Sequence, residues 1–210
     1  GASYEAYLQY AITVANPGSG NRYYVDSVLQ QQLYLQEGQT YRLDQSDSSN
    51  SGHPIRFSTT SNGTHAGGSQ YTTGVTTNGT PGSSGAYTQI TVASGAPTLY
   101  YYCTNHNYMG GTSKTPAAGT ITLTTTVVGG NPSNHPYHNV GSSNKYAIDG
   151  STATADVTLL LTEGTTFRFD QSDSSNSGHP LRFSTTANGT HGGGSEYTTG
   201  VTTSGTPGSS

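Results

Sequence analysis

A 48-residue segment occurs twice in this chain, and the repeat limits the possible folds more than any other feature. Residues 37–84 recur as residues 163–210 at a constant offset of 126 positions, and 40 of the 48 positions are identical. Most of the differences are conservative, such as Tyr41 against Phe167. A period of this length is too long for a solenoid repeat and fits domains arranged in tandem.

A weaker similarity extends the repeat toward the N-terminus. Residues 8–17 resemble residues 123–132, and residues 23–27 resemble residues 146–150. The second copy of the repeat has no counterpart of the residues that follow position 84, so we expect another chain, or a longer natural chain, to complete its sheet. The predicted organisation is a complete unit over residues 1–128, a Gly/Asn/Pro/Ser-rich connector over residues 129–145 and a partial second unit over residues 146–210.

The fold class follows from composition and hydrophobic periodicity. Only 30% of the residues are apolar and 9% are charged, whereas Gly contributes 29 residues and Tyr 16. Tyr and β-branched residues favour strands, Asn-Gly and Pro-Gly pairs mark turns, and no window has the spacing of an amphipathic helix. About seven or eight short antiparallel strands per unit indicate an all-β fold, either a sandwich or a Greek-key barrel.

The expected strands can be given by residue. In the complete unit they span residues 7–15, 31–36, 40–44, 54–59, 86–93, 98–103 and 120–128. By similarity to the first copy of the repeat, the second unit should form strands at residues 158–161, 166–170 and 180–185.

Charge excludes several classes of function. The formal net charge is −4 and the chain has only seven Lys and Arg residues, so nucleic-acid binding is not expected. No apolar run approaches the roughly 18 residues that a membrane helix needs, so membrane insertion is not expected. No nucleophile-elbow motif is present, and we do not expect an enzyme. The Thr-, Ser-, Gly-, Asn- and Tyr-rich composition is typical of extracellular and virion proteins.

The single cysteine, Cys103, is a free thiol, an intermolecular link or a metal ligand. It opens the pattern Cys103-x2-His106-x2-Met109, which follows a Tyr-rich strand and enters a Gly-Gly turn. About fifty residues earlier, His53 stands at the start of another expected strand. A soft thiolate, two imidazoles and a weak axial thioether form the ligand set of a blue-copper site.

At these residues the chain resembles the cupredoxin family of blue-copper proteins, which includes plastocyanin and amicyanin. The spacing of Cys103, His106 and Met109 is similar to the short ligand loop of amicyanin. The resemblance covers roughly residues 5–128 and implies a Greek-key sandwich. It also implies one copper ion in the complete unit, with His53 and His106 as imidazole ligands, Cys103 as the thiolate and Met109 as the axial ligand.

Two residues depart from the family pattern. Pro54, which has no N–H, follows the first ligand His, where the family usually has an amide that donates to the Cys sulfur. Asn105 precedes the second ligand His, where the family often has proline. The alternative interpretation is a cupredoxin fold kept as a scaffold without copper. The second unit has His179 as the counterpart of His53 but no Cys/His/Met loop, so alone it cannot form the site.

Other motifs have a structural and a functional interpretation. The acidic segment 44–50 lacks the Gly and final Glu of a calcium loop, which favours side-chain bonds within a turn. The Asn-Gly-Thr sequences favour tight turns over glycosylation, although both remain open. Four further histidines are interpreted as turn or connector residues in preference to metal sites. The Asn-Gly-Thr sequences begin at Asn62, Asn78 and Asn188, and the four histidines are His65, His191, His135 and His138.

Two functions fit these features. The first is a structural protein of an extracellular fibre, filament or virion surface, built of repeated cupredoxin-like domains that can bind copper. It would self-associate into a homopolymer, with residues 1–14 as a candidate donor strand for the neighbouring partial unit. The alternative is a soluble blue-copper electron carrier of the periplasm or a lumen.

Overall fold

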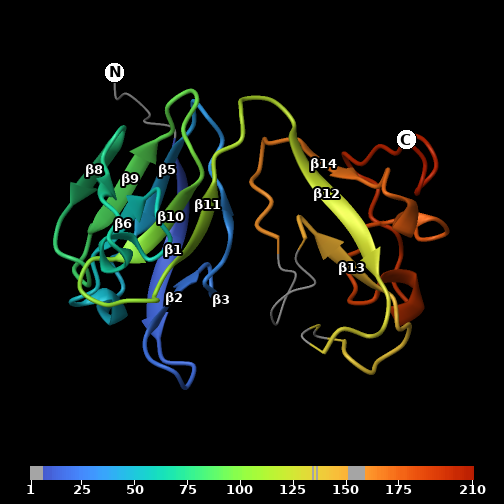
Figure 1. Cartoon of the computed structure of the whole chain (residues 1–210), viewed down its shortest axis with the longest axis horizontal. Helices are drawn as coiled ribbons and strands as arrows, with labels where there is room; N and C mark the ends of the chain where they lie inside the picture. Colours follow the sequence, from blue (N-terminus) through green and yellow to red (C-terminus); the bar gives the residue numbers. More distant parts are fainter. Residues whose placement is uncertain (1–6, 134, 136, 151–158) are drawn as a thin grey trace. The chain divides into compact units, whose positions relative to one another are not determined.

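The computed structural model describes residues 7–133, 135, 137–150 and 159–210 (Figure 1). The described chain is all-β, and its helical segments are single 3₁₀ turns. No described helix has the length and apolar character needed to cross a membrane. Two compact units are present. Unit 1 takes in Gly1–Ile121 and Thr158–Thr166, and unit 2 takes in Thr122–Val157 and Phe167–Ser210.

Unit 1 contains a six-stranded and a five-stranded sheet (Figure 1). Both are mixed, because β1 pairs with β5 and β11 pairs with β4 in parallel, whereas the other pairs are antiparallel. The first sheet has the order β3 (Val28–Leu29), β2 (Arg22–Val25), β1 (Leu8–Ala15), β5 (Thr40–Asp44), β9 (Tyr87–Thr91) and β8 (Val75–Asn78). The second has the order β4 (Leu33–Tyr34), β11 (Gly111–Lys114), β10 (Leu99–Cys103), β6 (Ile55–Ser58) and β7 (Gln70–Tyr71).

One hydrophobic core joins the two sheets of unit 1. Alternate residues of β5 point into it, so that Tyr41 and Leu43 are buried while their neighbours are partly exposed. The other sheet contributes Ile55, Phe57 and Leu99, all without exposed surface. Because strand side chains alternate between faces, each sheet gives one face to this core, and the unit is sandwich-like.

Tyrosines form much of this core because their hydroxyl groups find polar partners inside it. The Tyr23 hydroxyl donates to the carbonyl oxygen of His53 at 2.7 Å, and the Tyr101 hydroxyl donates to the carbonyl oxygen of Gln31 at 2.9 Å. Burial raises the pKa of Tyr23 and of Tyr101 above the ordinary range. The core therefore holds neutral phenols at any physiological pH.

Unit 2 has a three-stranded sheet in the order β13 (Lys145–Ile148), β12 (Ile121–Val128) and β14 (Phe167–Asp170). The sequence assigned residues 120–128 to the first unit, but β12 pairs with β13 and β14 of the second. The reason is that β12 is the counterpart of β1. Ser49 Oγ accepts from Val14 N in unit 1, and Ser175 Oγ accepts from Val127 N in unit 2, both at 2.9 Å.

The segment just before the second copy of the repeat behaves differently from the segment before the first copy. Leu160 packs against the core of unit 1, and the hydroxyls of Tyr10 and Thr162 lie 3.4 Å apart. Of the strand expected at residues 158–161, Thr158 lies outside the described residues and the other three form no strand. The strand expected at 166–170 is present as β14. The one expected at 180–185 is reduced to a single bridge between Phe183 and Tyr197.

The place of β1 also bears on the expected donor strand at residues 1–14. Residues 1–6 lie outside the described part of the chain. The remainder falls in β1, which is hydrogen-bonded to β2 on one edge and to β5 on the other. In unit 2 the corresponding place is already filled by β12. Strand donation by residues 1–14 to a neighbouring chain stays a prediction.

Five strands of unit 1 were not predicted: β2, β3, β7, β8 and β11. They have two to four residues each, and Tyr, Thr and Val are their commonest residues. Segments this short cannot show a period of two, and their pairing depends on long-range partners.

The repeat allows equivalent residues to be compared as a test of how completely the core of each unit is packed. Phe57 is fully buried in unit 1, whereas its counterpart Phe183 is partly exposed. Phe57→Ala should destabilise unit 1 by about 3–5 kcal/mol, because it removes a ring from a closed core. Phe183→Ala should destabilise unit 2 by a much smaller amount, because the Phe183 ring is already partly exposed. Amide hydrogen exchange, read separately for the two units, measures both changes. Equal losses would contradict the difference in packing.

Candidate metal centre

The pairing of β6 with β10 brings the first two candidate ligands together. Cys103 is the last residue of β10, and in this antiparallel register it lies opposite Ile55, the first residue of β6. His53 lies just before that strand and is separated from it by Pro54. The Pro54 carbonyl oxygen accepts from Thr104 N at 3.1 Å, so the ladder continues past the end of the strand. Proline is tolerated here because only its carbonyl group is used.

Three of the four predicted ligands form a cluster. Sγ of Cys103 lies 3.9 Å from Nδ1 of His53 and 3.7 Å from Nδ1 of His106. The two imidazole rings are 4.5 Å apart between centroids, with 48° between their planes. Their ligand atoms all lie within 4.8 Å of one another, and this is the one such group of three His, Cys, Asp or Glu residues in the described chain.

These distances fit a shared metal ion. With a metal–thiolate bond of about 2.3 Å and a metal–imidazole bond of about 2.0–2.1 Å, a trigonal arrangement separates sulfur and nitrogen by about 3.7–3.8 Å, and a tetrahedral one by about 3.5–3.6 Å. The observed 3.7 and 3.9 Å are closer to the trigonal separation than to the tetrahedral one. A trigonal plane of one Cys and two His ligands is the arrangement expected of a blue-copper site.

Met109, the predicted axial ligand, is also buried in unit 1. It belongs to the same hydrophobic core cluster as Cys103, and only 1% of its surface is exposed. Its carbonyl oxygen accepts from Tyr23 N at 2.9 Å, which ties the end of the ligand loop to β2. The thioether of Met109 is thus shielded from water, in the same core as the sulfur of Cys103.

The ligands differ in their access to solvent. Cys103 and His53 are buried, whereas His106 is exposed. Burial lowers the pKa of His53, and the neighbouring His106 lowers it further. His53 therefore stays neutral at physiological pH, which is the form that binds a metal.

A buried polar network holds His53 in place. The His53 carbonyl oxygen accepts from both Tyr23 Oη and Gln45 Nε2 at 2.7 Å. Gln45 Nε2 also donates to Asn50 Oδ1 at 3.1 Å, and Asn50 Nδ2 donates to the carbonyl oxygen of Ile12 at 2.7 Å. These contacts join the six-stranded sheet to the residue before Pro54. They fix the backbone of His53 before any metal arrives.

The ring of His53 has a partner of its own. Nδ2 of Asn21 lies 3.4 Å from Nε2 of His53, the ring nitrogen that faces away from Cys103. An amide can donate through its nitrogen or accept through its oxygen, so Asn21 can pair with either tautomer of the ring. A histidine that binds metal through Nδ1 needs an acceptor at Nε2–H, and Asn21 can supply one.

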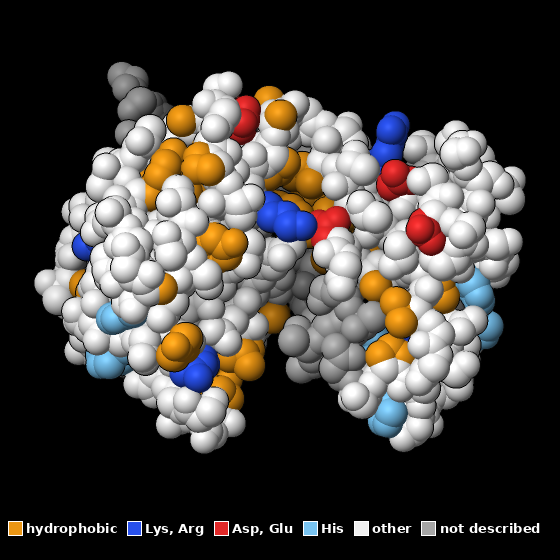
Figure 2. Space-filling model, in the orientation of Figure 1, with side chains coloured by type: hydrophobic (Ala, Val, Ile, Leu, Met, Phe, Trp, Pro, Cys, Tyr) orange, Lys and Arg blue, Asp and Glu red, His pale blue; other side chains and the backbone are white. Residues whose placement is uncertain are grey.

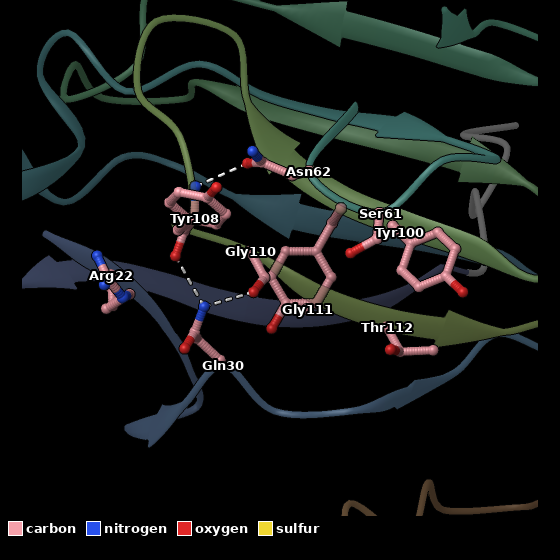
Figure 3. A pocket seen from close by; sticks show the side chains of 10 residues that line it. Arg22, Gln30, Ser61, Asn62, Tyr100, Tyr108, Gly110, Gly111 and Thr112 are labelled. Carbon is pink, nitrogen blue, oxygen red and sulfur yellow. Dashed lines mark hydrogen bonds between the residues drawn. The ribbon is translucent and has the colours of Figure 1, made fainter. Parts of the chain in front are cut away.

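The loop that carries His106 and Met109 is fixed from outside (Figure 3). Gln30 Nε2 donates to the carbonyl oxygens of Tyr108 and Gly110, at 3.0 and 2.6 Å, and Asn62 Oδ1 accepts from Tyr108 N at 2.7 Å. Tyr108 has a φ of 58°, a left-handed conformation stabilised by these contacts. A pocket of about 420 Å³ lies against this outer side of the loop, and the four candidate ligands do not line it.

Several of the remaining motifs have local hydrogen-bond partners or turn conformations. Asp44 and Asp47 accept from the backbone N–H groups of Ser46 and Ser49, the turn bonding expected of this acidic segment. Asn62 has a left-handed backbone, as an Asn-Gly turn requires. His65 lies in the 3₁₀ turn η2 (Gly63–Ala66), and its Nε2 donates to the carbonyl oxygen of Cys103 at 2.9 Å.

The connector histidines also have local partners. Nδ1 of His138 lies 3.0 Å from the carbonyl oxygen of Asn131, and Nδ1 of His135 accepts from Tyr137 N at 3.0 Å.

The sequence did not reveal the supporting residues Asn21, Gln30 and Asn62. Each lies more than thirty positions from the residue it supports. No local pattern marks such contacts. Only the repeat carried a signal, because Asn144 precedes His179 much as Asn21 precedes His53.

The close approach at Gly110 provides a test of the loop. A Cβ atom there would lie far inside contact distance of the Tyr101 carbonyl oxygen, whereas one at Gly95 would meet no atom. We expect Gly110→Ala to lower the urea midpoint of unit 1 clearly more than Gly95→Ala. Gly95→Ala is the control. It should lose only the stability that a side chain costs in a left-handed backbone conformation, about 1–2 kcal/mol. A smaller effect at Gly110 would show that the loop can move away.

The lowered pKa of His53 predicts how the stability of the metal-free protein depends on pH. As pH falls through about 6.5, the unfolded chain gains a proton at this position that the folded chain does not take up. Folding stability should therefore decrease with falling pH, and His53→Gln should flatten the slope. Urea unfolding of both proteins between pH 5 and 8 measures the difference. Equal slopes would contradict the assigned pKa direction.

No protein-family model matches the chain, and no curated protein sequence matches it either. The site consists of a buried thiol and a buried imidazole, a second imidazole open to solvent, and a thioether in the same core.

Proposed function

We propose that unit 1 is a copper-binding, cupredoxin-like domain whose ligands are His53, Cys103, His106 and Met109. The cluster of one thiolate and two imidazoles at trigonal spacing is the observation that carries this proposal. The departure at Pro54 leaves the ligand distances compatible with a metal ion. Asn105 Nδ2 donates to the carbonyl oxygen of Gly52 at 2.9 Å, so the side chain that replaces the expected proline links the ligand loop to the turn before His53.

Copper is favoured over zinc by the donor set. Zinc also accepts thiolate and imidazole ligands, but a thioether is a ligand typical of soft Cu(I). Met109 is almost completely buried in the core that contains Cys103. Bound copper would supply a reversible one-electron change at this position. The chain itself contributes a rigid set of ligands, with His53 fixed through its carbonyl group and the loop fixed through Gln30 and Asn62.

We further propose that the protein is a structural component of an extracellular or virion assembly, built from repeated units of this kind. The repeated sequence and the low charge support it. Lys and Arg side chains are few and scattered on the face shown in Figure 2, among uncharged polar side chains. Such a surface suits packing between copies better than charge-steered encounters with changing partners.

One observation favours the alternative, an electron carrier of the periplasm or a lumen. His106 is exposed while Cys103 behind it is fully buried. An exposed imidazole would be the natural point of contact between the metal and a redox partner. The structural role and this one differ in assembly state, which electron microscopy of the native material would reveal as filaments or dispersed molecules.

Copper addition tests the metal site directly. Cupric ion added to the reduced protein should give one equivalent of bound copper and an intense visible thiolate-to-copper band. Cys103→Ser should abolish the band, and Met109→Leu should shift it while copper stays bound. His179→Ala is the matched control in unit 2 and should leave the band unchanged.

The same experiment can refute the proposal. Failure to form the band with Cys103 reduced, or a colourless site that retains only zinc, would leave unit 1 without a copper function. Copper should also raise the melting temperature of unit 1, because only the folded state brings the ligands together.

A further inference from the structure

The pocket on the outer side of the ligand loop lies within unit 1, and the proposed metal centre does not use it. Its volume of about 420 Å³ falls in the range of about 300–1,000 Å³ that is usual for small-molecule sites. Figure 3 shows Tyr108 and Tyr100 on either side of Gly110 and Gly111. Two phenol rings therefore border a stretch of backbone that carries no side chain.

The lining narrows the class of ligand that this pocket can take. The described residues that line it include no carboxylate and no aliphatic side chain, and Arg22 is the one charged residue among them. A metal ion or an amine would find no anionic partner there. A wholly apolar molecule would remove water from the polar groups of Ser61 and Thr112 without replacing its hydrogen bonds. A ligand that combines C–H faces with hydroxyl groups fits this lining best.

Tyr108 gives an independent sign that the pocket is built for binding. Its side chain is part of a residue that is 65% exposed, and its φ of 58° is a left-handed conformation that is unfavourable for a bulky residue. Strain of this kind is found at ligand-binding positions, where the surrounding structure holds the residue in place. Asn62 and Gln30 hold the backbone of Tyr108 through its N–H and its carbonyl group. The ring is therefore positioned before a ligand arrives, which lowers the entropic cost of binding.

The opposite side of the pocket is equally well fixed. Tyr100 and Thr112 lie opposite each other in the pairing of β10 with β11, and their neighbours along both strands that face the core are buried. The Arg22 guanidinium donates to the carbonyl oxygens of Asn21 and Ser19, at 2.8 and 3.0 Å. Because a guanidinium group has five N–H donors, these bonds fix Arg22 and leave donors for a ligand.

We propose that this pocket binds a saccharide of one or two sugar rings, the chemical class that its lining matches. The C–H groups on one face of a sugar ring pack against the electron-rich face of a tyrosine. Sugar hydroxyl groups both donate and accept, so they pair with the hydroxyl groups of Ser61 and Thr112 and with the guanidinium of Arg22. The proposal goes beyond the copper function and does not rest on it, because the four candidate ligands do not line the pocket.

A titration of the metal-free full chain followed by amide NMR shifts tests the proposal. The probes are cellobiose, N,N′-diacetylchitobiose and digalacturonate, each added to about 20 mM so that dissociation constants in the millimolar range are covered. At least one of them should shift the amide signals of residues 108–112, Asn62 and Gln30, and the remaining signals should stay in place. Adenosine, inorganic phosphate and a proline-rich peptide are the comparison probes.

Substitutions then locate the site. Tyr108→Gly removes the ring and suits the left-handed backbone, and it should raise the dissociation constant about tenfold, the loss expected of one aromatic contact. Tyr108→Phe should keep most of the affinity. Tyr137→Gly removes another exposed tyrosine, one that does not line the pocket, and should leave the affinity unchanged. Tyr100→Ala should also weaken binding, and it leaves the ligand loop intact if Tyr108→Gly disturbs the fold.

Each contrary outcome overturns the proposal. If none of the three saccharides shifts the loop signals, the pocket is not a saccharide site. Stronger shifts with adenosine, phosphate or the peptide would assign the pocket to a flat heterocycle, an anion or a polypeptide instead. Saccharide binding that survives both Tyr108→Gly and Tyr100→Ala would lie elsewhere on the chain. Since the protein carries no metal in this titration, the result is the same whether or not unit 1 binds copper.

Discussion

The antiparallel pairing of β6 with β10 is the constraint on which the site depends. It sets Cys103 opposite Ile55 and so places the thiolate beside the turn that carries His53. A shift of one residue would turn every side chain of one strand to the opposite face. The buried residues Phe57 and Tyr101, which lie opposite each other in the same register, oppose such a shift. The packing of the core and the position of the ligands are therefore determined together.

The polar network around the backbone of His53 is a second constraint on the site. Buried amides and phenols are costly unless paired, and here they pair across both sheets. Gln45, Asn50 and Tyr23 share the task, and each contacts either His53 or a residue that does. The same sequence elements recur in unit 2, where Asn176 keeps the contact to β12 but its Oδ1 lacks the contact that Gln45 gives to Asn50.

The sequence predicted the all-β class and most long strands of unit 1, and it named the three residues that form the His53, Cys103 and His106 cluster. These depend on local alternation, on turn pairs such as Asn62-Gly63, and on the chemistry of a lone cysteine near two histidines. It assigned β12 to unit 1, whereas β12 belongs to the sheet of unit 2. The hydrophobic pattern of a strand at the boundary between two units does not show which sheet the strand joins. The sequence also missed β11 and the residues that support the loop, such as Gln30. Their roles come from contacts across about eighty positions, which no local pattern encodes.

The complete burial of Cys103 determines the covalent state of any assembly of this protein. A disulfide needs two sulfur atoms at about 2.05 Å and Cα atoms usually within about 7 Å. Two folded copies cannot reach these distances, because Cys103, the last residue of β10, has no exposed surface. Copies packed side by side in an oxidising medium would stay free of cross-links for as long as unit 1 remains folded. Their contacts could be broken and remade without a reductant, so that errors of packing would be corrected and not locked in place.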